Sequence, residues 1–357
     1  MDGAVPHRLV ERGVDEAVLV YEREAVEERV DHRHVEVVAA AGPVDDGELA
    51  RAWEGHAQEL LQLLAHAPKI PTEHPAKLRL MRRQALGVAF ACLAVALALA
   101  VAPDAEAGFS GKAAKAWTKR VAALGQRPAG GRHERQAGRI VHRRLDRLGY
   151  HVVTQGFRLP NGKRSRNIVG RTSRPRRVLI VAHIDGVRGT PAANDNASGI
   201  GVILELARAL RNAPGVVIAA LGAEERHVTG SPYHLGSLRL LRSLTEKQQN
   251  KIRFAISVDM VGVGTRLHIR GIESSPNRSA RLALARAQAL GFRASYLQDS
   301  GSSDHAEMSR AGIPAAWITW RWDQCWHEPC DQIERVKRWK LWAAGRVVRA
   351  TARHVLN

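Results

Sequence analysis

The fold of this chain is indicated by one short stretch, VLIVAHID at residues 178–185, in which five apolar residues run directly into a histidine and an aspartate. A continuous apolar run of this kind is typical of a strand that is buried on both faces of a sheet. Two further stretches have the same form: VVIAALGAEE at 216–225 and FAISVDMVG at 254–262. Strands of this type belong to largely parallel sheets that are covered by helices.

Helical periodicity separates the expected strands. Apolar residues recur at helical spacing in the segments 112–124, 133–148, 197–211, 232–240, 279–289, 305–311 and 336–354. Strands are expected at 152–157, 167–170, 178–182, 216–221, 254–258, 266–269 and 315–319. This alternation predicts an α/β fold with three layers, α/β/α, around a central mixed, largely parallel sheet. Residues 108–357 contain no repeat and no long linker, so we expect them to form one domain.

A signal-like segment lies inside the chain, at residues 81–107. Met81 is followed by two arginines, an apolar run at 85–102 and a small-residue cleavage pattern at 105–107. This order is typical of a secretory signal peptide, so we predict a secreted or periplasmic protein in which residues 1–80 are an upstream segment outside the domain. The alternative is a membrane anchor, with the upstream segment as a cytoplasmic tail and the domain outside the cytoplasm.

Charge is distributed unevenly along the chain. The formal net charge is +19, yet residues 1–80 carry 16 Asp and Glu against 9 Lys and Arg, so the basic excess lies in the remainder. Basic surfaces bind nucleic acids when a recognition motif accompanies them. The arginines here are scattered over expected helix faces without such a motif. We therefore predict a solvated basic surface and no nucleic-acid partner.

Residues of metal-binding type follow the expected strands. Three of them come after buried strands, one lies in the loop before the helix at 197–211, and one lies in a tryptophan-rich loop: His183, Glu225, Asp259, Asp195 and His327. Because the carboxyl ends of parallel strands meet at one edge of a sheet, these side chains are expected to lie together. Histidine nitrogens and carboxylate oxygens are common ligands of zinc. Each residue alone is also an ordinary turn or capping residue, but together they predict a metal site.

The order and spacing of these residues resemble metallopeptidase family twenty-eight, the secreted bacterial zinc aminopeptidases of the Streptomyces and Vibrio type. The resemblance rests on AHID at 182–185, NDNASG at 194–199, GAEE at 222–225, DMVG at 259–262, SDH at 303–305, GIP at 312–314 and HEPCD at 327–331. It extends upstream through RPAG at 127–130 and LGY at 148–150, and so covers the whole expected domain. The zinc exopeptidase fold is the fold that this resemblance implies.

The resemblance assigns two Zn²⁺ ions to five ligands. His183 and Asp259 would bind one zinc, and Glu225 and His327 would bind the other. Asp195 would bridge both ions. The family also implies that the peptide bond after Asp195 is cis.

The implied reaction is the removal of N-terminal residues from peptide substrates, which would make the protein a hydrolase and a zinc metallo-aminopeptidase. A metal-bound hydroxide would be the nucleophile, and Glu224 would be the general base. Asp185 would orient the imidazole of His183 by a hydrogen bond. The resemblance implies the same role for Asp331 near His327.

Tryptophans and cysteines surround the last ligand. Close relatives carry a tyrosine directly before the last histidine, where its hydroxyl can support the oxyanion, whereas this chain has Trp326, whose indole N–H is also a donor. Trp326 and Trp322 are candidates for binding the substrate. Cys325 and Cys330 lie at the offsets of two cysteines in Streptomyces-type relatives, which implies a disulfide. A pair of free thiols is the alternative.

Two other functions stay open. A glutaminyl cyclase-like acyltransferase of the same fold would bind a single zinc and lack the first histidine, whereas His183 and Asp185 are present here. A catalytically inactive, peptidase-like binding domain would have lost ligands, whereas all five ligand positions and Glu224 are intact. We expect peptide substrates, no membrane association after signal cleavage, and a monomer.

Overall fold

A computed structural model describes residues 108–357, except 174, 176, 227–231 and 273–276. The predicted signal segment and residues 1–80 lie outside the described residues, so the predictions made for them stay predictions. Within the described ranges, no helix combines the length and the apolar character that crossing a membrane requires.

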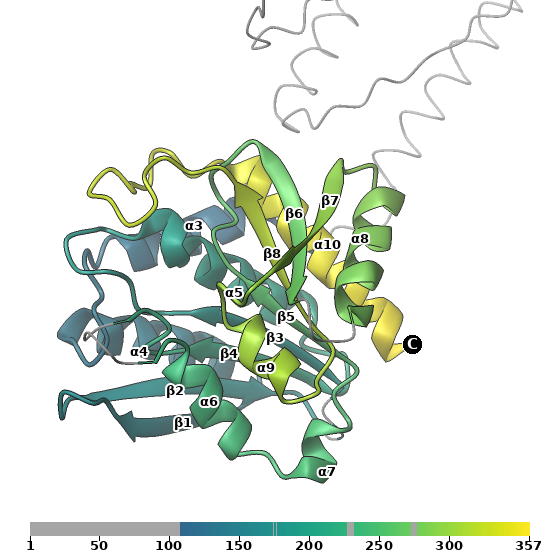
Figure 1. Ribbon diagram of the computed structural model, residues 1–357, viewed down its shortest axis with the longest axis horizontal. Helices are drawn as coiled ribbons and strands as arrows, with labels where there is room; N and C mark the ends of the chain where they lie inside the picture. Colours follow the sequence, from purple (N-terminus) through teal and green to yellow (C-terminus); the bar gives the residue numbers. More distant parts are fainter. Residues whose placement is uncertain (1–107, 174, 176, 227–231, 273–276) are drawn as a thin grey trace, which may run out of the picture. The chain divides into compact units, whose positions relative to one another are not determined.

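One mixed sheet of eight strands runs through the described residues (Figure 1). Its strands are β1 (His151–Arg158), β2 (Arg164–Arg171), β3 (Val178–His183), β4 (Val216–Leu221), β5 (Phe254–Val258), β6 (Arg266–Ile272), β7 (Ala294–Asp299) and β8 (Ala315–Arg321). The order across the sheet is β1-β2-β4-β3-β5-β8-β6-β7. The four central strands β4, β3, β5 and β8 are parallel to one another, so their carboxyl ends meet at one edge.

Helices cover both faces of the sheet. They are α3 (Gly111–Ala122), α4 (Arg132–Arg147), α5 (Gly199–Ala209), α6 (Leu235–Arg242), α7 (Glu246–Gln249), α8 (Arg278–Ala289), α9 (His305–Arg310) and α10 (Arg338–Leu356), with a short turn η1 (Ala193–Ser198) before α5. Along β3, Ile180 packs into the larger core with α3, α5 and α10, whereas Leu179 packs against Leu240 of α6 on the other face. This two-residue alternation confirms the three-layer α/β/α prediction.

The expected strands and helices are all found, with boundaries that differ by a few residues. β7, at the end of the sheet, was not predicted from the sequence, because most of its residues are half-buried or exposed and it contains no apolar run. α7, a single turn, was not predicted either. The helix expected at 197–211 begins at Gly199, because η1 occupies the residues before it.

Gly199 allows the start of α5 to pack directly on the end of β5. A Cβ atom built on Gly199 would lie 2.1 Å from the carbonyl oxygen of Val258. Asn196 connects the same two elements, since its Nδ2 donates to that carbonyl oxygen at 3.0 Å and its Oδ1 accepts from the Gly199 N–H at 2.8 Å. This close approach brings the loop that carries Asp195 over the carboxyl edge of the sheet.

We expect Gly199→Ala to destabilise the fold by about 1–3 kcal/mol, because the added methyl group must push α5 away from β5. Urea unfolding of the full chain measures this change. Gly156→Ala is the matched control, since a Cβ at Gly156 would lie 3.5 Å from its nearest neighbouring atom. Equal unfolding midpoints for the two variants would contradict the role given to Gly199.

Candidate metal centre

The five residues predicted as ligands lie together at the carboxyl edge of the sheet. His183 Nε2 lies 3.1 Å from Asp195 Oδ1 and 3.4 Å from Asp259 Oδ1. His327 Nε2 lies 3.0 Å from Glu225 Oε1 and 3.3 Å from Asp195 Oδ2. The two carboxylate oxygens of Asp195 therefore face two different histidines, and the cluster divides into two groups that share this one side chain.

Adjacent parallel strands position three of these residues. β3 ends at His183, β4 ends shortly before Glu225, and β5 ends directly before Asp259. β3 pairs with both β4 and β5, so the three side chains emerge side by side. The peptide bond between Asp195 and Asn196 is cis, as the resemblance implied.

Strained backbone surrounds the cluster. Among the described residues, the non-glycine positions with positive φ are Ala192, Ala223, His234, Met260 and His327. Each of them is a residue of this edge or lies within a few positions of a predicted ligand or of Glu224. Left-handed conformations cost a side chain about 1–3 kcal/mol and cluster at functional sites.

Two further aspartates anchor the cluster through the backbone. Asp331 accepts hydrogen bonds from the N–H groups of Asn194 at 2.7 Å and Asp195 at 3.0 Å. The prediction that Asp331 orients His327 is therefore wrong, and its carboxylate positions the Asp195 loop instead. Burial raises the pKa of Asp331 to about 6, although these two N–H groups act in the opposite direction.

Asp185 also binds backbone N–H groups, here those of the two adjacent glutamates. Its carboxylate accepts from the N–H groups of Glu224 at 3.1 Å and Glu225 at 3.2 Å. The distance from its Oδ1 to Nδ1 of His183 is 3.7 Å, which is longer than a hydrogen bond. Asp185 thus holds the turn after β4 as well as facing the first histidine.

Arg127 lies behind the cluster and was not predicted to have a role. Its fully buried guanidinium donates to the carbonyl oxygens of Ile184 at 3.1 Å, Pro191 at 2.8 Å and Ala192 at 2.7 Å. Burial lowers its pKa to about 10, while Asp331 and Asp185 act against that change. Arg127 joins the segment after β3 to the loop that carries Asp195.

Glu224 has partners that were not predicted from the sequence. Nε2 of His234 lies 3.2 Å from Glu224 Oε1, and Nδ1 of the same ring lies 3.2 Å from Glu307 Oε1. Burial raises the pKa of Glu224 to about 8, although His183 and His234 act in the opposite direction. Burial also opposes the charge of His234, but its contacts with Glu224 and Glu307 raise its pKa to about 10.

A cavity of about 400 Å³ opens onto the cluster. Besides the five predicted metal ligands, the lining of this cavity includes Tyr233, Trp317, Arg321 and Trp326. Trp326 is half exposed and its ring lies 4.3 Å from that of His327, so it is placed to meet a ligand. Trp322, the other predicted substrate residue, is 68% exposed and lies outside the described lining of the cavity. Tyr233 gave no signal in the sequence because it lies within a segment expected to be an ordinary helix.

The loop that carries His327 is closed by a disulfide between Cys325 and Cys330, as the resemblance implied. His327 lies between the two cysteines in the sequence. Asp323 accepts from the N–H of Cys325 at 3.0 Å and from Arg335 at 2.7 Å, which fixes the start of the loop. The last ligand is therefore held by a covalent bond and by the hydrogen bonds around it.

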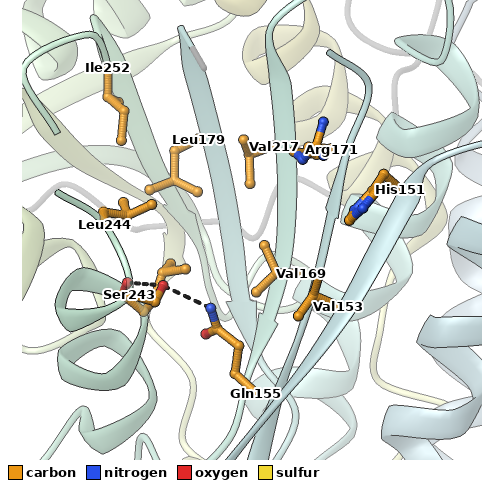
Figure 2. A pocket seen from close by; sticks show the side chains of 11 residues that line it. His151, Val153, Gln155, Val169, Arg171, Leu179, Val217, Ser243, Leu244 and Ile252 are labelled. Carbon is orange, nitrogen blue, oxygen red and sulfur yellow. Dashed lines mark hydrogen bonds between the residues drawn. The ribbon is translucent and has the colours of Figure 1, made fainter. Parts of the chain in front are cut away.

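A second cavity of about 170 Å³ lies away from this edge (Figure 2). Leu179 and Val217, near the amino-terminal ends of β3 and β4, line it together with Ser243 and Leu244, which follow α6. Its described lining contains no carboxylate and one histidine, His151. Histidines and carboxylates therefore cluster at the carboxyl edge of the central strands and not around this second cavity.

The cluster fits divalent metal ions. Four buried carboxylates, Asp195, Glu224, Glu225 and Asp259, line one cavity. Within the described part of the chain, the ion pairs recorded for them are with histidines alone. Buried charges need partners or metal coordination, and the buried Asp259 Oδ1 has no hydrogen-bond partner among the described residues. A set of histidine nitrogens and carboxylate oxygens suits zinc.

An α/β sheet that carries a histidine–carboxylate cluster at its carboxyl edge has the form of a metal-dependent hydrolase. The model of peptidase family M28 matches residues 167–352, just over half of the chain, and the chain therefore belongs to this family.

Individual relatives were found among curated proteins and solved structures. The chain is 31% identical over 204 residues to aminopeptidase YwaD of Bacillus subtilis, a match that covers 52% of this chain and only 44% of that protein. Its fold is similar to the structure of BSAP, a zinc aminopeptidase from Bacillus subtilis, with a TM-score of 0.63 and 20% identity over 70% of this chain and 96% of that one. It is also similar to a glutaminyl cyclase from Bacteroides thetaiotaomicron, with a TM-score of 0.58 and 22% identity over 68% and 96% of the two chains.

We expect Asp331→Asn to weaken zinc binding about 10- to 100-fold, because an amide can offer only one acceptor to the two N–H groups of the Asp195 loop. Competition with a fluorescent zinc chelator measures the affinity. The exposed Asp146→Asn on α4 removes the same charge far from the loop and should bind zinc like the unaltered chain. If both variants retain full affinity, Asp331 does not position the ligand.

Proposed function

We propose that the domain is a two-zinc aminopeptidase that removes N-terminal residues from peptides. The single observation that carries the proposal is the division of Asp195 between two histidines, with Oδ1 facing His183 and Oδ2 facing His327. One carboxylate shared in this way suits a bridging ligand between two ions. On this proposal, His183 and Asp259 would hold one zinc, and Glu225 and His327 would hold the other.

Bound zinc ions would supply Lewis acidity, which polarises a peptide carbonyl and makes water more acidic. Glu224 then acts as the general base, taking a proton from the attacking water and returning it to the leaving amine. His234, held between Glu224 and Glu307, fixes the orientation of this carboxylate. A buried carboxyl whose pKa is raised is suited to accept and release a proton near neutral pH.

The cavity supports an exopeptidase in preference to an enzyme that cleaves long chains internally. Its volume of about 400 Å³ is in the range of small-ligand sites. Carboxylate oxygens in its lining can accept hydrogen bonds from a free α-amine, which marks the N-terminus of a substrate. Membership of family M28 and the similarity to Bacillus aminopeptidases agree with this reading. Peptides are therefore the proposed substrates.

The alternative function is that of a single-zinc glutaminyl cyclase, which the similarity to such an enzyme from Bacteroides brings into consideration. A single zinc would leave one of the two ligand groups without an ion, and its buried carboxylates would then lack a counter-charge. The two-zinc reading accounts for both groups, and we prefer it.

We propose a secreted or periplasmic location for the domain. The disulfide between Cys325 and Cys330 supports this, because disulfides persist in oxidising compartments. It closes a loop that carries a ligand, so reduction of the bond would loosen the centre.

We expect the purified full chain, equilibrated with zinc and then dialysed, to retain two zinc ions per molecule by elemental analysis. His327→Ala should retain one, because it removes a ligand from one group and leaves His183, Asp195 and Asp259 in the other. One zinc in the unaltered chain would contradict the two-zinc proposal and favour the cyclase.

We expect Glu224→Gln to lower kcat on aminoacyl p-nitroanilides by about 10²- to 10⁴-fold, because glutamine cannot take a proton from water. Its zinc content should stay unchanged. Glu328→Gln makes the same change of charge at an exposed position of the His327 loop and serves as the control. Full activity in Glu224→Gln would remove this residue from the mechanism.

A further inference from the structure

One arginine lies among the acidic groups of the cavity. Of the lysines and arginines described by the structure, Arg321 alone lines the cavity beside the metal-type residues. No ion pair with a carboxylate is recorded for its guanidinium within the described ranges. Its recorded side-chain contacts are the rings of Trp317, at 5.9 Å, and Trp322, at 5.4 Å. A half-buried guanidinium without a carboxylate partner is free to bind an anion.

The strand register places Arg321 on the face of the sheet that turns towards the cavity. β8 pairs antiparallel with β6, so Trp317 lies opposite Arg270 and Arg321 lies opposite Arg266. Trp317 lines the cavity and its indole N–H donates to the carbonyl oxygen of Asp259 at 3.1 Å. Ile318 and Trp320, on the opposite face, belong to the larger core. Arg321 therefore lies on the same face of β8 as Trp317, at the end of the strand and near the predicted metal ligands.

Positive charge gathers on this face of β6 and β8. Arg270 lies over Trp317 at 4.7 Å, but Asp299 neutralises it with an ion pair of 3.1 Å. Arg266 and Arg321 lie directly opposite each other, an arrangement in which like charges repel. Burial lowers the pKa of the nearby His268, and the surrounding arginines lower it further, which reflects the same positive potential. A bound anion would relieve this repulsion.

The net charge of the metal-loaded cavity also favours an anion beside Arg321. Two divalent ions would offset the charge of the four carboxylates of the cavity, and Glu307 faces His234, so the guanidinium of Arg321 would remain without a counter-charge. We propose that Arg321 binds a carboxylate of the substrate and makes the enzyme selective for substrates that present a carboxylate to it. The carboxylate is either the side chain of an N-terminal Asp or Glu or the terminal carboxylate of a dipeptide. This inference rests on the proposed peptidase function.

The first arm of the test compares glutamyl and glutaminyl p-nitroanilides, which have nearly the same shape and differ in charge. The full chain should favour the glutamyl substrate. Arg321→Met should lower the ratio of kcat/KM for the glutamyl substrate to kcat/KM for the glutaminyl substrate by about tenfold to a hundredfold. Arg321→Glu should lower the ratio further. Arg281→Met, on the exposed face of α8, makes the same change in net charge and should leave the ratio unaltered.

The second arm compares the dipeptide Leu-Gly with its C-terminal amide. Dependence on Arg321 in this arm alone identifies the terminal carboxylate as the bound group, and dependence in the first arm alone identifies the side chain. If neither ratio changes in Arg321→Met, the proposal is overturned.

Binding separates this proposal from the peptidase proposal itself. Calorimetric titration of the zinc-loaded full chain with L-glutamate and L-glutamine, and with free Leu-Gly and its amide, needs no turnover. Inactivity of the unaltered chain on every substrate would defeat the peptidase function, yet weaker binding of either carboxylate ligand to Arg321→Met would still support the role of Arg321. The role of Arg321 would be overturned if no substrate is turned over and the unaltered chain and Arg321→Met bind L-glutamate and Leu-Gly with equal affinity.

Discussion

Four carboxylates share one buried cavity at the carboxyl edge of the sheet, and their mutual repulsion is the constraint that the surrounding structure must satisfy. Each has a partner of its own. Asp331 holds the backbone of Asp195, the hydroxyl of Ser303 donates to Asp259 at 2.8 Å, His234 faces Glu224, and His327 faces Glu225. Non-glycine residues in left-handed conformations gather at the same edge. A fold that maintains this much unfavourable charge and strain in one place holds a site that is complete only with its cations.

The sheet makes this concentration of charge possible. Parallel central strands deliver His183, Glu225 and Asp259 to one edge, and the close contact of Gly199 with β5 lays the Asp195 loop across it. Arg127 then ties that loop to the segment after β3 through hydrogen bonds to backbone carbonyl oxygens. Because it bonds to the backbone, its positive charge lies behind the carboxylates without occupying their ligand atoms.

The sequence was sufficient to predict the fold and to find the histidines and carboxylates that gather at the carboxyl edge, because both depend on short-range patterns. Buried strands are recognisable as apolar runs, and His183 and Asp259 follow such runs directly. Residues that act across long distances in the sequence could not be found in this way. His234 lies in a segment that reads as an ordinary helix, and its contact with Glu307 depends on how α6 and α9 pack. Asp331 was predicted to contact His327, but its carboxylate accepts from the N–H of Asn194. The path of the loop determines which of these groups the carboxylate meets, and that path cannot be predicted from the local sequence.

The spacing of the cluster along the chain has a consequence for synthesis. Arg127 lies near the start of the described domain, whereas His327 follows β8, the last strand of the sheet. Proteins are synthesised and begin to fold from the N-terminus. A nascent chain in which the loop after β8 has not yet been synthesised therefore contains His183 and Asp259 but lacks His327. On the proposed function, unfinished or truncated copies are therefore inert, and the activity appears only when nearly the whole domain has been made.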